Sequence, residues 1–171
     1  MKYKEWSMPS GSPRVRQNLE AAGIPALLAA ILAARGITQP DQARRLLTPG
    51  AEPVLDPMLL RDMDRAAARV RRALETGEHL AVYGDYDVDG ITSTCLLTDC
   101  LRRMGGQVTP YIPDRLEEGY GLNLEAIHTL ADQGVTLIVT VDCGITAVEE
   151  VAFAAGLGVD VVVTDHHECK E

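Results

Sequence analysis

Acidic and imidazole side chains gather at three places in the 171-residue sequence, each directly after a run of apolar residues. The segment GDYDVDG follows HLAVY, a single aspartate follows VTLIVTV, and DHH follows VDVVVT. The residues concerned are Asp85, Asp87, Asp89, Asp142, Asp165, His166 and His167. Crowded carboxylates are costly unless cations neutralise them, and mixed oxygen and imidazole donors suit Mn²⁺ or Mg²⁺. Two such ions about 4 Å apart can activate a water and stabilise both oxygens of a phosphoryl displacement.

The first cluster places an aspartate at every second position. In an extended segment Asp85, Asp87 and Asp89 would share one face, because side chains alternate along a strand. The spacing also resembles the start of a calcium-binding EF-hand loop. An EF-hand is excluded, since a strand pattern precedes the cluster and no glutamate stands at the last loop position. Gly84 and Gly90 allow tight turns, and GITST predicts a helix start whose N–H groups face an anion.

Apolar periodicity explains why the three clusters should meet. Strands are predicted at 79–84, 107–112, 135–142 and 159–165, with helices at 91–105, 123–134 and 146–158 between them. This alternation predicts a mostly parallel sheet with helices on both faces. Ligands bind beyond the carboxyl ends of parallel strands, so all three clusters should lie at one edge. A helix N-cap would explain Asp142 alone, but not seven such groups together.

The residues before the first strand are predicted to be mainly helical. The first eighteen lack periodicity and indicate an irregular arm. Further helices are predicted over residues 19–35, with a bend or a restart near Pro25, and over 38–49 and 62–76. Prolines mark a connector over 49–58. The chain is therefore divided into an N-terminal arm and helical region, 1–60, and a second domain, 61–171.

Composition limits the function classes. A net charge of −9 excludes a module held on nucleic acid mainly by its own positive field, but not a nuclease, because bound cations add positive charge. The longest apolar run is too short to span a bilayer. The four cysteines lack zinc-site spacing, and Cys95 and Cys143 lie among apolar residues. We predict that these two are buried reduced thiols, which favours the cytoplasm.

Three motifs together resemble the DHH phosphoesterase superfamily: GDYDVDGITST, VDCGIT and TDHHE. Two further segments, YIPDRLEEGYGLN and LLTPGAEPVLDPMLLRDMDRA, narrow the resemblance to the RecJ-type family of bacterial single-stranded-DNA-specific exonucleases. The resemblance covers residues from about 29 to 168. It implies 5′→3′ hydrolysis of single-stranded DNA in repair and recombination, with two Mn²⁺ or Mg²⁺ ions.

The resemblance also implies roles for individual residues. The implied metal ligands are Asp87, Asp89, Asp142 and His166, with Asp142 as the bridge between two ions and Asp85 as a further candidate. His167 and Gly90 would contact the substrate phosphate, and Asp165 would orient the histidines. The implied catalytic residues are Asp142, His166 and His167. Tyr83 stands where many superfamily members carry a histidine.

Members of this family continue past the DHH triplet with a fourth acidic ligand and a domain that grips the substrate. This chain ends at Glu171, so we expect an incomplete domain that binds metal weakly and has little activity alone. One alternative is a DHH phosphoesterase for pyrophosphate, cyclic dinucleotides or short oligonucleotides. Another is a non-catalytic binding module with the same fold. A partner such as a single-stranded-DNA-binding protein leaves no motif in the sequence.

Overall fold

The computed structural model describes residues 7, 9–48, 50 and 55–169. The chain divides into two compact units, Met1–Asp56 and Pro57–Glu171. Much of the predicted connector, at residues 49 and 51–54, lies outside the described residues, as does the start of the predicted arm. Within the described part of the chain, no helix is both long and apolar enough to cross a membrane.

The first unit is a small helical cluster of α1 (Pro13–Ala21), α2 (Ala26–Ala34) and α3 (Pro40–Leu47). Its buried residues are Leu19, Ile24, Ala29, Leu32, Ala33 and Ala43. The prediction of an irregular arm is wrong from Pro13 onward, because this proline begins α1. Proline is tolerated there, since an amide in the first turn of a helix has no partner within the helix. The helix predicted over 19–35 is two helices, separated by Gly23 with φ +89° and by Pro25.

The second unit is built on a four-stranded parallel sheet. Its strands are β1 (His79–Tyr83), β2 (Gln107–Tyr111), β3 (Val135–Val141) and β4 (Asp160–Thr164), in the order β2-β1-β3-β4. The central strands β1 and β3 are almost wholly buried, which is why both are near-continuous apolar runs. The predicted parallel sheet is confirmed.

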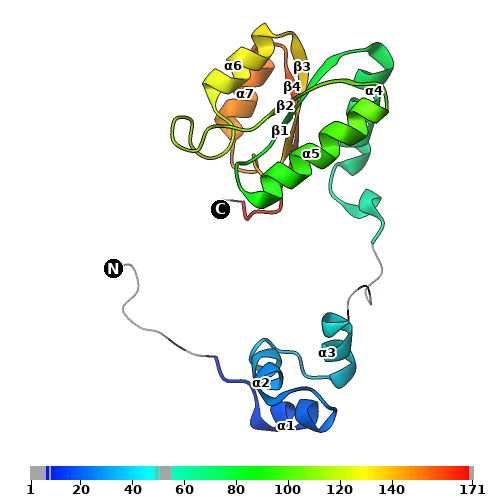
Figure 1. Cartoon of the computed structure of the whole chain (residues 1–171), viewed down its shortest axis with the longest axis vertical. Coiled ribbons are helices and arrows are strands. Elements are labelled where there is room, and N and C mark those ends of the chain that lie inside the picture. Colours follow the sequence, from blue (N-terminus) through cyan, green and yellow to red (C-terminus); the bar gives the residue numbers. More distant parts are fainter. Residues whose placement is uncertain (1–6, 8, 49, 51–54, 170–171) are drawn as a thin grey trace. The chain divides into compact units, whose positions relative to one another are not determined.

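Helices cover both faces of the sheet (Figure 1). On one face lie α4 (Met63–Thr76) and α5 (Val88–Arg103), which pack against Leu80, Val82 and Val139. On the other lie α6 (Leu124–Asp132) and α7 (Val148–Gly156), which pack against Ala81 and Ile138. A short 3₁₀ turn, Pro57–Leu59, precedes α4. The apolar clusters on the two faces hold the sheet in place, and they therefore position the loops that follow the carboxyl ends of its strands.

The cysteines follow the prediction only in part. Cys143 is fully buried, but Cys95 is exposed, so the prediction for Cys95 is wrong. The apolar neighbours of Cys95 in the sequence are helical neighbours, and its own position in α5 faces outward. All four cysteines are free thiols.

The amino edge of the sheet is held by an ionic cluster around Arg69 of α4. The guanidinium donates to Glu78 Oε2 at 2.7 Å and to Asp160 Oδ2 at 2.6 Å. Thr136 donates to the same Glu78 oxygen at 2.8 Å. The side chains of Arg69 and Glu78 are each 18% exposed. The hydrogen bond from Arg69 lowers the pKa of Glu78 below its ordinary value.

Substituting Glu78→Gln should destabilise the protein by about 1–2 kcal/mol at pH 7, because Arg69 and Thr136 lose a charged acceptor. A carboxylate with a pKa lowered by folding adds stability above its unfolded pKa and loses it as the pH falls through its folded pKa. The free energy of unfolding, measured with urea, should therefore differ between wild type and variant at neutral pH, and this difference should disappear below about pH 4. The exposed neighbour substitution Glu75→Gln is the control. A difference that persists unchanged at pH 3 would contradict this account.

Candidate metal centre

The connection from β1 to α5 carries the first acidic cluster. Asp87 is the N-cap of α5, and its Oδ1 accepts hydrogen bonds from the amides of Asp89 at 2.9 Å and Gly90 at 3.0 Å. These bonds lower the pKa of Asp87, the one from Gly90 having the largest effect. Asp89 lies in the first helical turn. The prediction of an extended segment from Asp85 to Asp89 is therefore wrong, because the helix begins at Val88.

The two glycines of this connection permit close approach of the backbone. A Cβ at Gly90 would lie 2.4 Å from the carbonyl oxygen of Asp85, and one at Gly84 would lie 1.9 Å from Thr94 Oγ1. The Gly90 amide already donates to Asp87. A phosphate would have to share this amide with Asp87, and the phosphate contact expected of Gly90 stays a prediction. The role of Gly90 in this structure is to let α5 start directly against the Asp85 backbone.

Asp142 directly follows β3 and has a left-handed backbone conformation, with φ +63°. Aspartate and asparagine tolerate this region better than other side chains with a Cβ. The amide of Asp142 donates to the Thr164 carbonyl at 3.0 Å, which ties the residue to the end of β4. Its side chain is only 6% exposed. Burial, and then the charge of Asp87, raise the pKa of Asp142 above its ordinary value.

The DHH triplet directly follows β4. The Asp165 side chain is 1% exposed and accepts three hydrogen bonds: from the His167 amide, the His167 Nδ1 atom and the Ile145 amide, at 3.0, 2.7 and 2.9 Å. The hydrogen bond to Asp165 raises the pKa of His167. Burial alone would raise the pKa of Asp165, but the hydrogen bonds lower it. Asp165 therefore fixes the ring of His167.

The three strand ends bring their ligands together. Among the described residues, one group of potential metal-binding atoms comprises Asp85, Asp87 and Asp142, and a second comprises Asp142, His166 and His167. Within each group the atoms lie within 4.8 Å of one another. Nε2 of His166 is 2.9 Å from Asp142 Oδ1. Asp142 is thus common to both groups.

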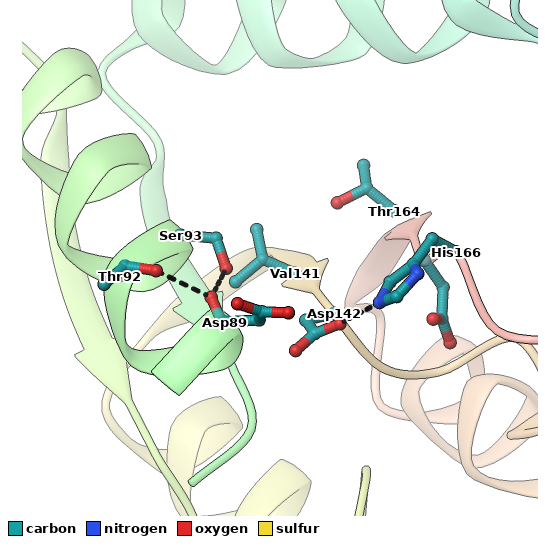
Figure 2. Close-up of a pocket in the computed structure, with 8 residues that line it drawn as sticks. Asp89, Thr92, Ser93, Val141, Asp142, Thr164 and His166 are labelled. Atoms are coloured by element: carbon teal, nitrogen blue, oxygen red, sulfur yellow. Dashed lines mark hydrogen bonds and ion pairs between the residues drawn. The ribbon is translucent and has the colours of Figure 1, made fainter. Parts of the chain in front are cut away.

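Asp89 belongs to neither group and instead lines the adjoining pocket of about 400 Å³. Figure 2 shows its carboxylate turned toward Asp142, with His166 on the far side of Asp142. The other polar residues that line this pocket are Thr92, Ser93, Thr164 and Asp165. The hydroxyls of Thr92 and Ser93 donate to the Asp89 carbonyl, which leaves the Asp89 carboxylate to face the pocket.

Two buried oxygens make the site suitable for cations. Oδ1 of Asp85 and Oδ1 of Asp142 are buried without a hydrogen bond; His166 lies close to the latter, but outside hydrogen-bonding geometry. An unpaired buried carboxylate oxygen is costly, and a divalent cation removes that cost. Carboxylate and imidazole donors in these proportions fit Mn²⁺ or Mg²⁺. The residues present therefore fit a divalent cation.

One side chain of this centre, that of Tyr120, was not predicted from the sequence. The Tyr120 hydroxyl lies 3.3 Å from His167 Nδ1 and 3.5 Å from the carbonyl oxygen of Asp142. Its ring also packs edge-on against Tyr86 and His167. The one signal in the sequence was a tyrosine between two glycines, Gly119 and Gly121, a pattern that projects one side chain from a tight loop.

Several proteins similar to this chain are named as exonucleases. The chain is 41% identical over 155 residues to the single-stranded-DNA-specific exonuclease RecJ of Bacillus subtilis (strain 168), covering 91% of this chain and 20% of that protein. A crystal structure of exonuclease RecJ bound to manganese matches with a TM-score of 0.64 and 42% identity, over 69% of this chain and 30% of its own. The crystal structure of RecJ from Thermus thermophilus in complex with Mn²⁺ matches with a TM-score of 0.65 and 31% identity. This match covers 95% of this chain and 22% of that chain.

The chain thus spans about a fifth of the length of the Bacillus subtilis relative. A family profile, that of the DHH family, N-terminal domain, matches residues 79–171. This segment is more than half of the chain, and it contains all seven acidic and imidazole groups at the carboxyl edge of the sheet. The chain belongs to the DHH family.

Proposed function

We propose that this chain provides the metal-binding part of a 5′→3′ exonuclease that hydrolyses single-stranded DNA. The observation that carries the proposal is the position of Asp142, whose buried carboxylate belongs to both groups of potential ligands. Further support comes from the relatives, which are named as single-stranded-DNA-specific exonucleases, and from their structures with Mn²⁺ or Mg²⁺.

In this proposal one cation is held by Asp85, Asp87 and Asp142, and the other by Asp142 and His166. When bound, such ions activate a water and stabilise the attacking and leaving oxygens of phosphodiester hydrolysis. Asp89 faces the same pocket and is the remaining acidic candidate.

His167 has a different proposed role, as a contact to the substrate phosphate. Asp165 accepts a hydrogen bond from Nδ1 of the ring, so Nε2 is the nitrogen left to contact a substrate. A raised pKa favours the imidazolium form, which can donate a hydrogen bond to a phosphate oxygen. Asp165 would act by holding this ring in one orientation.

A chimera tests the proposal, because the chain covers only part of its relatives. The chain would replace the aligned residues of the Bacillus subtilis relative, and the product would be assayed with Mn²⁺ on end-labelled DNA. We expect mononucleotide release from single strands with a free 5′ end, and none from blunt duplex. Hydrolysis of pyrophosphate or dinucleotides without digestion of long strands would instead favour a small-substrate phosphoesterase. A folded chimera without any hydrolysis would favour a binding module.

A further inference from the structure

A series of hydrogen bonds, together with one pair of stacked tyrosine rings, holds the loop between β2 and α6. Its members, here named the Glu118 clamp, are Tyr83, Tyr111, Glu118 and Asn123. Tyr111 donates to Glu118 Oε1 at 2.6 Å, and Asn123 Nδ2 donates to the same oxygen at 3.1 Å and to the Tyr83 hydroxyl at 3.2 Å. Every member is buried or partly buried.

The clamp rests on the sheet itself. Tyr83 and Tyr111 are register partners on the adjacent strands β1 and β2, and their rings stack at a centroid distance of 5.1 Å. Tyr83 is fully buried, and its hydroxyl donates to the Gly121 carbonyl at 2.9 Å. Asn123 also caps α6, because its Oδ1 accepts from the Ala126 amide at 2.7 Å. Both ends of the loop are therefore fixed to regular structure.

Glu118 is the acceptor on which the loop depends. Its other oxygen, Oε2, accepts from the Asp114 amide at 2.7 Å, so one carboxylate takes three hydrogen bonds. Burial would raise the pKa of Glu118, but hydrogen bonds led by that from Tyr111 lower it. Burial, and then the contact with Glu118, raise the pKa of Tyr111 to about 12. At neutral pH the carboxylate is charged and the tyrosine is a donor, so the clamp is closed.

The clamp fixes the one loop residue that reaches the metal centre. Tyr120 lies between Glu118 and Gly121, the two points where the loop is tied, and is flanked by glycines with φ +82°. Tyr120 is 52% exposed, and its ring contacts His167 edge-on, with a centroid distance of 6.0 Å. Asp165 and the Tyr120 hydroxyl both lie near Nδ1 of the His167 ring, at 2.7 and 3.3 Å.

We propose that Glu118 is a positioning residue for His167, acting through the clamp and the Tyr120 ring. This inference rests on the proposed role of His167 as the phosphate contact. Glu118 itself touches neither the acidic cluster nor the histidines. Without its charge, the side chain would accept weaker hydrogen bonds, and one of its three donors would lose its acceptor, so the loop would hold Tyr120 less firmly against the imidazole.

The test compares Glu118→Gln with the adjacent control Glu117→Gln, whose side chain is exposed. In the metal-free protein, NMR should show a nuclear Overhauser contact between the Tyr120 and His167 rings. We expect the contact to weaken in E118Q, while exchange of the Asp114 amide, which donates to Glu118, accelerates on the order of tenfold. The resonances of His128, which lies on α6 and pairs with Asp132, should not move.

A milder variant keeps the test usable if E118Q does not fold. Tyr111→Phe removes one donor to Glu118 and leaves the carboxylate in place. The ring contact should therefore weaken, and amide exchange should accelerate, by less than in E118Q. An unchanged ring contact in the variants, or equal losses in E117Q, would overturn the inference.

Cleavage by the chimera is a separate readout. E118Q there should lower kcat about tenfold while KM and Mn²⁺ affinity stay the same, because only a group acting at the reacting phosphate is disturbed. Unchanged kcat despite a weakened ring contact would overturn the positioning role. A chimera inactive even with Glu118 present would overturn the proposed function instead, and the ring contact would still be measurable.

Discussion

Substituting Asp142→Asn should abolish Mn²⁺-dependent cleavage by the chimera, with a loss of about 10³-fold or more. Asp142 is shared by both groups of potential ligands, so losing its charge weakens both cation sites at once. Asparagine keeps the size of the side chain and tolerates the left-handed backbone that the residue adopts. The effect is therefore one of charge and not of backbone strain.

The same variant should not lose stability without metal. Burial and the charge of Asp87 both disfavour the ionised form of Asp142, so removing that charge relieves repulsion. Urea unfolding of the metal-free protein should give at least the wild-type stability, while Mn²⁺ should no longer protect it. Asp99→Asn, at an exposed carboxylate of α5, is the matched control. Near-normal cleavage by the Asp142→Asn chimera would refute the proposed site.

Gly90→Ala is the change expected to cost the most stability, about 3 kcal/mol by urea unfolding. The added Cβ would lie 2.4 Å from the Asp85 carbonyl oxygen and 2.6 Å from its carbonyl carbon and amide nitrogen. All three are backbone atoms, so no side-chain rotation relieves the overlap. Either α5 must move away from the end of β1 or the turn holding Asp85 must deform, and Mn²⁺ binding should fall with it.

Gly156→Ala is the matched control, because this glycine also lies in a helix but has open space within 4 Å of the position that a Cβ would take. There the substitution should stabilise the protein by up to about 1 kcal/mol, since alanine loses less backbone freedom on folding. If both substitutions behave alike, steric contact at Gly90 is not what matters.

The convergence of the acidic groups could be predicted because it depends only on strand direction. Apolar runs locate β1, β3 and β4, and their carboxyl ends must meet at one edge once the strands are parallel. The prediction of one pocket for Asp142 and His166 needed no knowledge of side-chain geometry. The 2.9 Å between their nearest atoms is a consequence of that topology.

Features set by local competition or by distant contacts could not be predicted in this way. The alternating aspartates suggested an extended segment, but Asp87 is a better N-cap than strand residue, and α5 starts three residues earlier than periodicity indicated. The same N-cap side chain also accepts a hydrogen bond from the Gly90 amide. The contact of Tyr120 with His167 joins two loops far apart in the chain, and no local pattern specifies it.

The parallel sheet order also has a consequence for the folding pathway. The two central strands pair with each other, Leu80 opposite Leu137, although β2 and two helices lie between them in sequence. Closing so long a segment is entropically slow, and every local element can form before it. Asp85 and Asp142 follow these two strands, so their carboxylates approach only when that closure occurs. Electrostatic repulsion in the cluster therefore opposes the late, long-range step of folding and leaves early collapse unaffected.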